Sequence, residues 1–466
     1  MQQDVRGAGR RTGTARRGRA GRLALLVAAG SALLGLAATS VGVAPVGLPA
    51  RVVASSARGV ATEYPSFDAT GAPVGTSTWR VVAGTGNCCE NHLASAPDGT
   101  LYDFGGTYPH LSTDHGRTWR RVQPTTPLVS GEGTIAVAPN GDVVGIGWDP
   151  YSGDHLQAFK YDASTREWLW AEQPLHTPFY DRQWVAVVPG PVRVGGTEAE
   201  YAVVLRGGYP SKDLYLVSTD GLTYTTPSLR DVDQLLGGST TERVELEVDP
   251  HADHGQSLTN TNLAPLGIGT ILTGSDLVTG IAAGCSTGTY IASGDVTWSC
   301  YVPQDAARVR WQAADSAGNL HATEWSPAGT VDLVFSADGG VTATRSSVPL
   351  PAGYEVRSSG GRDLKAHAAA GVIAVTTHAQ DTVGGASQDL VFVYRYPDPT
   401  RGEDHPVLER IHEVGLGDLR DGVGVGASGA RFDFSTLAIL PDGTIAVSFN
   451  DSTHTSPAVA VLVRSA

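Results

Sequence analysis

The most constraining feature of this chain is the octapeptide at residues 112–119, Ser-Thr-Asp-His-Gly-Arg-Thr-Trp. The side chains of Ser112 and Asp114 can accept hydrogen bonds from backbone N–H groups of a tight turn, and Gly116 can adopt a positive φ angle. Trp119 can then pack beneath the hairpin that the turn closes. The octapeptide therefore predicts a tight turn between two β-strands.

Shorter or degenerate copies of this pattern recur at wide intervals along the chain. They lie at residues 218–224, 293–298 and 336–343, and each keeps a Ser two residues before an Asp. A single short motif can arise by chance, whereas four related copies favour a repeat architecture. We therefore expect the same turn to occur several times in the fold.

A second repeated unit combines a strand of small or apolar residues, a Pro-Asp-Gly-like turn and another strand. It occurs at residues 93–102, 134–143, 312–321 and 436–445, and turns of this kind between apolar runs indicate hairpins. From about residue 76 onward, short β-type runs alternate with Gly, Asp, Asn and Pro, and no stretch has helical periodicity. The sequence therefore predicts an all-β fold.

The octapeptide and its copies resemble the Asp-box (BNR) repeats of the sialidase-like superfamily. The resemblance implies a single secreted β-propeller over residues 76–466, with each copy in the turn between the two outer strands of a blade. Laying the repeats end to end gives seven blades, and six, the number in sialidases, is the alternative. Only three strands are visible in the last blade, so we expect residues 79–83 to supply its fourth strand and close the ring.

The N-terminus predicts export. The first 22 residues contain seven Arg and one acidic residue, and an apolar run of 16 residues follows from Leu23 to Ala38. This pattern is typical of a signal peptide or a signal anchor, and the sequence leaves the two open. A Ser-Ser-Ala site before Arg58 suits a signal peptidase. We assign residues 1–57 to the signal and a linker, and 58–75 to a linker, and we expect a secreted or cell-surface protein.

Charge narrows the range of partners. The formal net charge is −14, and it becomes −20 without residues 1–22, which carry seven positive charges and one negative charge. This balance argues against a nucleic-acid partner and against electrostatic docking to a membrane, so membrane contact is expected only through an N-terminal anchor. No motif predicts a cofactor or a metal site.

Four cysteines in an exported chain predict disulfides. Cys285 and Cys300 would close a short loop, which leaves the adjacent pair Cys88 and Cys89 to form a vicinal disulfide. The alternative is that Cys88 or Cys89 pairs with Cys285 or Cys300. The sequence does not choose between these connectivities.

Charged residues recur just before the expected inner strand of each blade, where they would surround the mouth of a central funnel. The carboxylates at these positions are Glu90, Glu132 and Asp181. The other residues expected at the mouth are His92, Arg182, Trp184, Arg310, Lys365, His367, Arg431 and Asp433. An aromatic ring, a carboxylate and a guanidinium together suit a sugar or another polyhydroxylated ligand.

This funnel predicts a protein that acts on or binds an extracellular carbohydrate or cell-surface polymer. In a glycoside hydrolase, Asp181, Glu90 and Glu132 would supply the catalytic carboxylates, and Arg182 would hold the substrate. The sialidase resemblance does not extend to an active site, because the F/Y-R-I-P-like motif is absent and no motif identifies a Tyr/Glu pair. A non-catalytic extracellular binding propeller is the alternative. Carboxylates about 5–9 Å apart favour hydrolysis, whereas carboxylates paired with Arg or Lys favour binding or a structural role.

Overall fold

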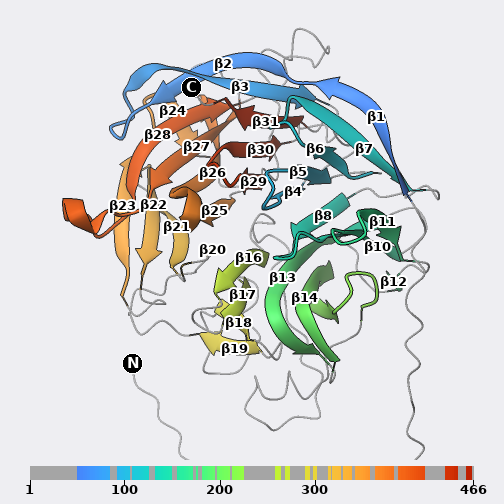
Figure 1. The fold of residues 1–466 in the computed structure, drawn as a ribbon. Helices are drawn as coiled ribbons and strands as arrows, with labels where there is room; N and C mark the ends of the chain where they lie inside the picture. Colours follow the sequence, from blue (N-terminus) through green and yellow to red (C-terminus); the bar gives the residue numbers. More distant parts are fainter. Residues whose placement is uncertain are drawn as a thin grey trace, which may run out of the picture. The chain divides into compact units, whose positions relative to one another are not determined.

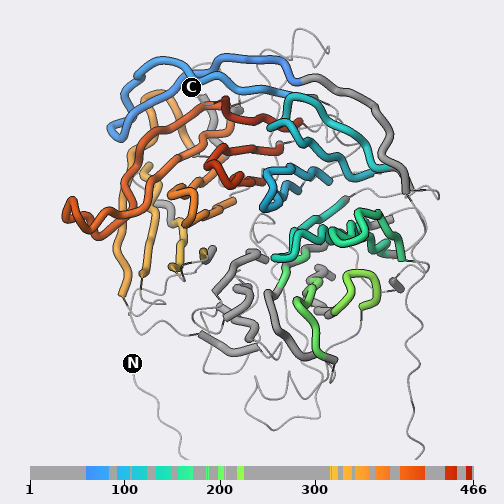
Figure 2. Tube along the Cα trace, viewed as in Figure 1, coloured from blue at the N-terminus to red at the C-terminus, as the bar shows by residue number. Residues whose placement is uncertain are grey.

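The structure is a computed structural model, and Figure 2 shows its Cα trace coloured along the sequence. The chain divides into two units, Met1–Ala44 and Pro45–Ala466, and every described residue belongs to the second. The described residues are 50–83, 92–104, 108–124, 132–149, 155–171, 175–176, 181–194, 197–209, 212–224, 258–263, 268–272, 289–293, 298–301, 313–315, 317, 319–326, 329–337, 342–356, 363–381, 387–414, 436–449 and 458–463.

Antiparallel β-sheet makes up the regular structure of these residues, apart from two short 3-10 turns, η2 (Ala368–Ala370) and η3 (Pro399–Arg401). The predicted all-β fold class is confirmed. None of the helices in the described part of the chain has the length and apolar character needed to cross a membrane.

The described strands hydrogen-bond into six sheets. The largest, with ten strands, contains two separate runs of consecutive strands, so we divide it and number seven groups in chain order as sheets 1 to 7 (Figure 1). Sheet 1 contains β4 (His92–Ser95), β5 (Leu101–Phe104), β6 (His110–Ser112) and β7 (Thr118–Pro124). Sheet 2 contains β8 (Glu132–Val137), β9 (Val143–Asp149), β10 (His155–Asp162) and β11 (Glu167–Trp170), with β12 (Leu175–His176) also on β10. Sheet 3 contains β13 (Asp181–Val194), β14 (Thr197–Tyr209) and β15 (Lys212–Ser218).

The remaining four groups follow the same plan. Sheet 4 contains β16 (Leu258–Leu263), β17 (Ile268–Leu272), β18 (Thr289–Ser293) and β19 (Trp298–Tyr301). Sheet 5 contains β20 (Ala313–Ala314), β21 (Leu320–Ser326), β22 (Thr330–Ser336) and β23 (Thr344–Pro349). Sheet 6 contains β25 (Leu364–His367), β26 (Val372–Asp381), β27 (Ser387–Arg395) and β28 (Val407–Val414), with β24 (Tyr354–Val356) also on β26. Sheet 7 contains β29 (Thr436–Ile439), β30 (Ile445–Phe449) and β31 (Ala458–Leu462).

The first strands of the seven sheets are neighbours in a closed series. β4 lies beside β8, β8 beside β13, β13 beside β16, β16 beside β20, β20 beside β25, β25 beside β29, and β29 beside β4. Apolar side chains fill the spaces between sheets 1 and 2, 2 and 3, 5 and 6, 6 and 7, and 7 and 1. Between sheets 1 and 2, for example, the rings of Phe104 and Phe159 meet edge to face with their centroids 4.8 Å apart. The first strand of each sheet is therefore held between its two neighbours.

The turn at residues 112–119 joins the third and fourth strands of sheet 1. The Gly116 N–H donates to Ser112 Oγ and the Thr118 N–H donates to Asp114 Oδ1, both at 2.8 Å. Gly116 has φ +74°, and Trp119 is buried. These contacts confirm the turn chemistry expected from the sequence.

The three degenerate copies lie at the equivalent place in their sheets. Ser218 ends β15 and accepts a hydrogen bond from the Gly221 N–H at 2.8 Å. Ser293 ends β18 and Ser336 ends β22, so each copy follows the third strand of a sheet. The two described turns also touch the neighbouring sheet, because a Cβ atom would lie 2.4 Å from Val461 Cγ2 at Gly116 and 2.7 Å from Val144 Cγ1 at Gly221. In these two copies the motif therefore builds a similar turn, one residue shorter at Ser218, and a similar contact between sheets.

Three strands precede sheet 1. β1 (Ala50–Arg58) pairs with β7, β2 (Val60–Phe67) pairs with β28 and β3, and β3 (Pro73–Ala83) pairs with β31. Trp79 to Ala83 lie opposite Leu462 to Ala458, at the position where the sequence predicts a fourth strand for the last sheet. We call β1, β2 and β3 the N-terminal strands.

β2 lies within residues 58–75, which were expected to form a linker. In β2 the buried residues include Thr62 and Ser66 as well as Tyr64, and they alternate with exposed residues such as Glu63. Because small polar residues occupy half of the buried positions, the strand has little apolar alternation for sequence analysis to detect. The composition of this segment therefore resembles the composition of a linker.

Candidate ligand-binding site

The starting ends of adjacent first strands carry several of the predicted site residues. His92, Glu132 and Asp181 are the first residues of β4, β8 and β13, and Lys365 is the second residue of β25. Because β4 lies beside β8 and β8 beside β13, the structure brings the backbones of the first three residues to neighbouring strand ends. We call this region the strand-start face.

The start of β13 has an irregular backbone. Asp181 lies opposite Gly208 and Gln183 lies opposite Gly207, so Arg182 is an extra residue in the strand, as in a β-bulge. Bulges redirect side chains and are common beside active sites. Glycine within a strand is also common where a bulge or a ligand lies close to the backbone. The predicted residues Asp181, Arg182 and Trp184 thus belong to a segment with an irregular backbone.

Neighbouring first strands are tied together by side chains at one position of the repeat. This position lies four residues before the Ala or Leu that opens the Pro-Asp-Gly-like turn, and it is occupied by His92, Thr134 and Thr436. Thr436 Oγ1 accepts a hydrogen bond from the Leu93 N–H at 3.0 Å, and Thr134 Oγ1 accepts one from the Val185 N–H at 3.2 Å. We call His92, Thr134 and Thr436 the clamp residues.

His92, a predicted ligand residue, makes the corresponding contact from β4 to β8. Its Nδ1 atom lies 2.8 Å from the Ile135 carbonyl oxygen and 3.2 Å from the Ile135 backbone nitrogen. The side chain is buried. The imidazole therefore holds two strands together at this face.

Lys365, another predicted site residue, is paired with a carboxylate. Its Nζ atom lies 3.2 Å from Asp363 Oδ1, and both side chains are largely shielded from solvent. The other carboxylate oxygen of Asp363 accepts a hydrogen bond from the Leu437 N–H at 2.7 Å, which ties β29 to the segment that precedes β25. Asp363 thus connects sheets 6 and 7 and holds the ammonium group of Lys365. His367 lies at the far end of β25, where its Nδ1 accepts a hydrogen bond from the Ala370 N–H at 3.1 Å and caps η2.

The other predicted site residues fall outside the described parts. Glu90, Arg310, Arg431 and Asp433, together with Cys88, Cys89 and Cys285, are not among the described residues. The backbones of Glu132, Asp181, Arg182, Trp184 and Cys300 are described, but their side chains are not. The disulfides and the roles of these residues therefore stay predictions.

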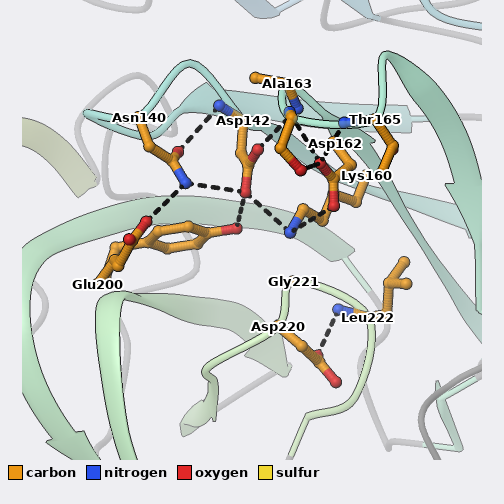
Figure 3. A network of polar contacts seen from close by, with 12 residues as sticks. Asn140, Asp142, Lys160, Asp162, Ala163, Thr165, Glu200, Asp220, Gly221 and Leu222 are labelled. Carbon is orange, nitrogen blue, oxygen red and sulfur yellow. Dashed lines mark hydrogen bonds and ion pairs between the residues drawn. The ribbon is translucent and has the colours of Figure 1, made fainter.

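A polar network lies between sheets 2 and 3, at the turn that ends β8 (Figure 3). Asp142 Oδ2 lies 2.8 Å from Lys160 Nζ and accepts a hydrogen bond of 2.8 Å from the Tyr201 hydroxyl, while Asp142 Oδ1 accepts one from the Ala163 N–H. Burial raises the pKa of Asp142, but the hydrogen bonds from these three groups outweigh it and hold that pKa below its ordinary value. Because Tyr201 belongs to sheet 3, the network joins two sheets at the end of β8 that is opposite the strand-start face.

A second buried network joins sheets 5 and 6. Asp315 Oδ2 lies 3.0 Å from His321 Nε2 and accepts a hydrogen bond of 2.5 Å from the Tyr396 hydroxyl. Burial acts to raise the pKa of Asp315, but the contacts with His321, Tyr396 and Asn319 lower it to about 2. The side chains of Asp315 and His321 are fully buried. This network therefore holds two sheets together and is closed to a ligand.

Sequence analysis did not identify Thr134, Thr436 or Asp363. The sequence does contain a signal for the first two, since a Thr stands at the same distance from the turn in two repeats. The partner of each is a backbone N–H in another sheet, which the local pattern does not reveal. Among the described residues, no three or more His, Cys, Asp or Glu side chains lie together in a way that could hold a metal ion.

No protein-family model matches this chain, and the search of curated proteins found no match. Among solved structures, it is similar to "YCF48 bound to D1 peptide", with a TM-score of 0.43, 10% identity, and coverage of 83% of this chain and 97% of the other. For the intramolecular trans-sialidase from Ruminococcus gnavus the TM-score is 0.34, with 13% identity and coverage of 81% and 95%. For the β-propeller domain of the Trilobed protease from Pyrococcus furiosus these values are 0.34, 10%, 82% and 99%. All three likenesses are distant.

Proposed function

We propose that this chain is an exported seven-bladed β-propeller that binds a glycan at its strand-start face. The closed series of seven neighbouring first strands supports the seven blades, with each sheet as one blade. The pairing of β3 with β31 supports closure of the ring, because it gives sheet 7 a fourth strand and covers its outer edge. The Arg-rich start followed by an apolar run supports export to a secreted or cell-surface location.

The observation that carries the binding site is the start of β13. Within four residues this segment supplies a carboxylate, a guanidinium and an indole, from Asp181, Arg182 and Trp184. The register shift at Arg182 and the facing glycines are features that accompany close approach of a ligand. This combination suits a sugar, because an aromatic face packs on the ring while charged groups bind the hydroxyls.

The described charged groups favour binding over catalysis. At the strand-start face, Lys365 is paired with Asp363, and His92 is engaged with the backbone of Ile135. The paired Lys365 and Asp363 provide fixed polar groups at this face, whereas His92 is buried and holds two strands together. Glycoside hydrolysis is the second candidate, because Glu132 and Asp181 begin adjacent strands and would both border one ligand.

The test is binding of the secreted protein to a panel of immobilised glycans that includes sialylated, fucosylated, uronate-containing and neutral oligosaccharides. Asp181→Asn and Arg182→Ala are expected to lose binding at least tenfold. Their matched controls are Asp98→Asn and Arg117→Ala, both at exposed turn positions, and these are expected to bind as the wild type does. Asp98→Asn keeps the oxygen that accepts the Thr100 N–H.

Hydrolysis is measured on the same variants with fluorogenic glycosides that include sialosides. Turnover that disappears in Asp181→Asn would establish the hydrolase candidate. A protein that binds no glycan on the panel and cleaves no glycoside would overturn the proposed function.

A further inference from the structure

The free edges of the first strands create a general problem in this fold. One edge of each first strand is paired with the second strand of its own sheet, and the other edge carries backbone N–H groups without a strand partner. A buried N–H without an acceptor is costly, so such groups are satisfied by side chains or water. The clamp residues satisfy them at Leu93 and Val185.

Three contacts in the described part of the chain follow one rule along the repeat, whereas the Leu437 N–H is held by Asp363 instead. A residue at the clamp position contacts the backbone of the residue that comes directly after the next clamp position. Thus Thr436 contacts Leu93, which follows His92, and His92 contacts Ile135, which follows Thr134. By the same rule Thr134 contacts Val185, and the clamp position of β13 is Trp184.

Trp184 differs from the clamp residues in its chemistry. The hydroxyl groups of Thr134 and Thr436 accept hydrogen bonds, and a histidine ring nitrogen accepts or donates according to its tautomer, whereas an indole only donates. Trp184 is therefore unable to accept a hydrogen bond from an N–H of the next first strand. The equivalent residues of β4, β8 and β29 each contact the backbone of the next first strand. Thr134 still holds the residue directly after Trp184.

We propose that Thr134 is the positioning residue of the ligand site, and that it fixes the start of β13 relative to the start of β8. This inference rests on the proposed function for the nature of the ligand. Thr134 is buried, and its side chain is stiff because it is branched at Cβ. Its Oγ1 holds the Val185 N–H at 3.2 Å, one residue after Trp184 and three after Arg182. Glu132 lies two residues before Thr134 on the same strand, so this hydrogen bond links the two groups of predicted ligand residues.

The test compares Thr134→Val with Thr436→Val. Each substitution removes one buried hydroxyl that accepts a backbone N–H, with little change of shape, and only Thr134 borders the start of β13. Thr134→Ser keeps the hydroxyl and serves as the rescue variant. Two quantities are measured on the secreted full chain: hydrogen exchange of the peptide containing residues 181–187, and affinity for the glycan selected on the panel, with 3′-sialyllactose included as a fixed probe.

We expect Thr134→Val to speed amide exchange at residues 181–187 at least tenfold and to weaken glycan binding about tenfold. Thr436→Val is expected to lower the unfolding temperature about as much as Thr134→Val does, and to leave exchange at residues 181–187 and glycan affinity at their wild-type values. Thr134→Ser is expected to restore wild-type exchange and wild-type affinity. If exchange at residues 181–187 does not change in Thr134→Val, the positioning role is overturned, whatever the protein binds. If exchange changes but affinity equals that of Thr436→Val, the link to the ligand site is overturned. If the wild type binds no glycan, the proposed function fails, and the exchange result alone then decides whether Thr134 holds β13.

Discussion

Replacement of Gly116 by Ala should separate the two demands that the Ser112–Trp119 turn places on this residue. Gly116 has φ +74°, and a Cβ atom there would lie 2.4 Å from Val461 Cγ2 and 3.2 Å from Val461 Cβ. The left-handed backbone costs Ala about 1–2 kcal/mol, and forcing an extra methyl group into a packed contact costs about 1–3 kcal/mol more. We therefore expect Gly116→Ala to lower the free energy of unfolding by about 2–5 kcal/mol.

Gly99→Ala isolates the backbone part of this cost. Gly99 has φ +84° in the turn between β4 and β5, and nothing lies within 4 Å of the position that a Cβ atom would take. This variant should lose only about 1–2 kcal/mol. Urea unfolding followed by tryptophan fluorescence measures both losses under the same conditions.

A double-mutant cycle with Val461→Ala isolates the steric part. Val461 lies in β31 of the neighbouring sheet, so its truncation should relieve the overlap and give a favourable coupling of about 1–3 kcal/mol with Gly116→Ala. Equal losses for Gly116→Ala and Gly99→Ala, together with a coupling near zero, would refute the view that this turn packs directly on the next sheet.

Two further predictions concern pH. The pKa of Asp315 is about 2 in the folded protein, below its ordinary value of 3.8, so the unfolded chain takes up this proton first. The unfolding temperature should therefore fall as the pH drops from about 4 to 2. Asp315→Asn should make this dependence on pH less steep, and an equally steep dependence in the variant would contradict the role of Asp315. Burial, with a smaller effect of Arg410, lowers the pKa of His412 to about 4 from 6.5, so stability should rise with pH between 4 and 6.5. His412→Phe keeps an aromatic ring against Trp79 and should reduce this rise in a series of thermal-unfolding measurements. An equally steep rise in the variant would show that His412 is not its cause.

The sequence predicted well those features that depend on local chemistry. The turn at Ser112 requires two side-chain acceptors and a positive φ, and all three requirements can be read from neighbouring residues. The same holds for the hairpin at Ala96, where the Gly99 N–H donates to the Ala96 carbonyl and the Thr100 N–H donates to Asp98. Repetition of such turns was enough to predict the all-β class.

Features that depend on a distant partner were not predicted. Asp363 is bonded to the backbone of Leu437, in a different sheet, and a local pattern around Asp363 contains no trace of that contact. His92 was expected to face a ligand because it stands at the start of a strand, yet its neighbour in the fold is Ile135. The sequence therefore located the strand-start face but did not distinguish residues that hold strands together from residues available to a ligand.

The pairing of β3 with β31 has a consequence for the order in which the fold is completed. Trp79 and Val81 of β3 pair with Leu462 and Ala460, which lie far along the sequence from them. Contacts between such distant segments slow folding, because the intervening chain must be ordered before they form. Until β31 arrives, β3 has an unpaired edge and Trp79, fully buried in the folded state, lacks its final packing. The N-terminal strands are thus among the last parts of the fold to be completed, and until then the unpaired edge of β3 is a point at which the chain is open to aggregation.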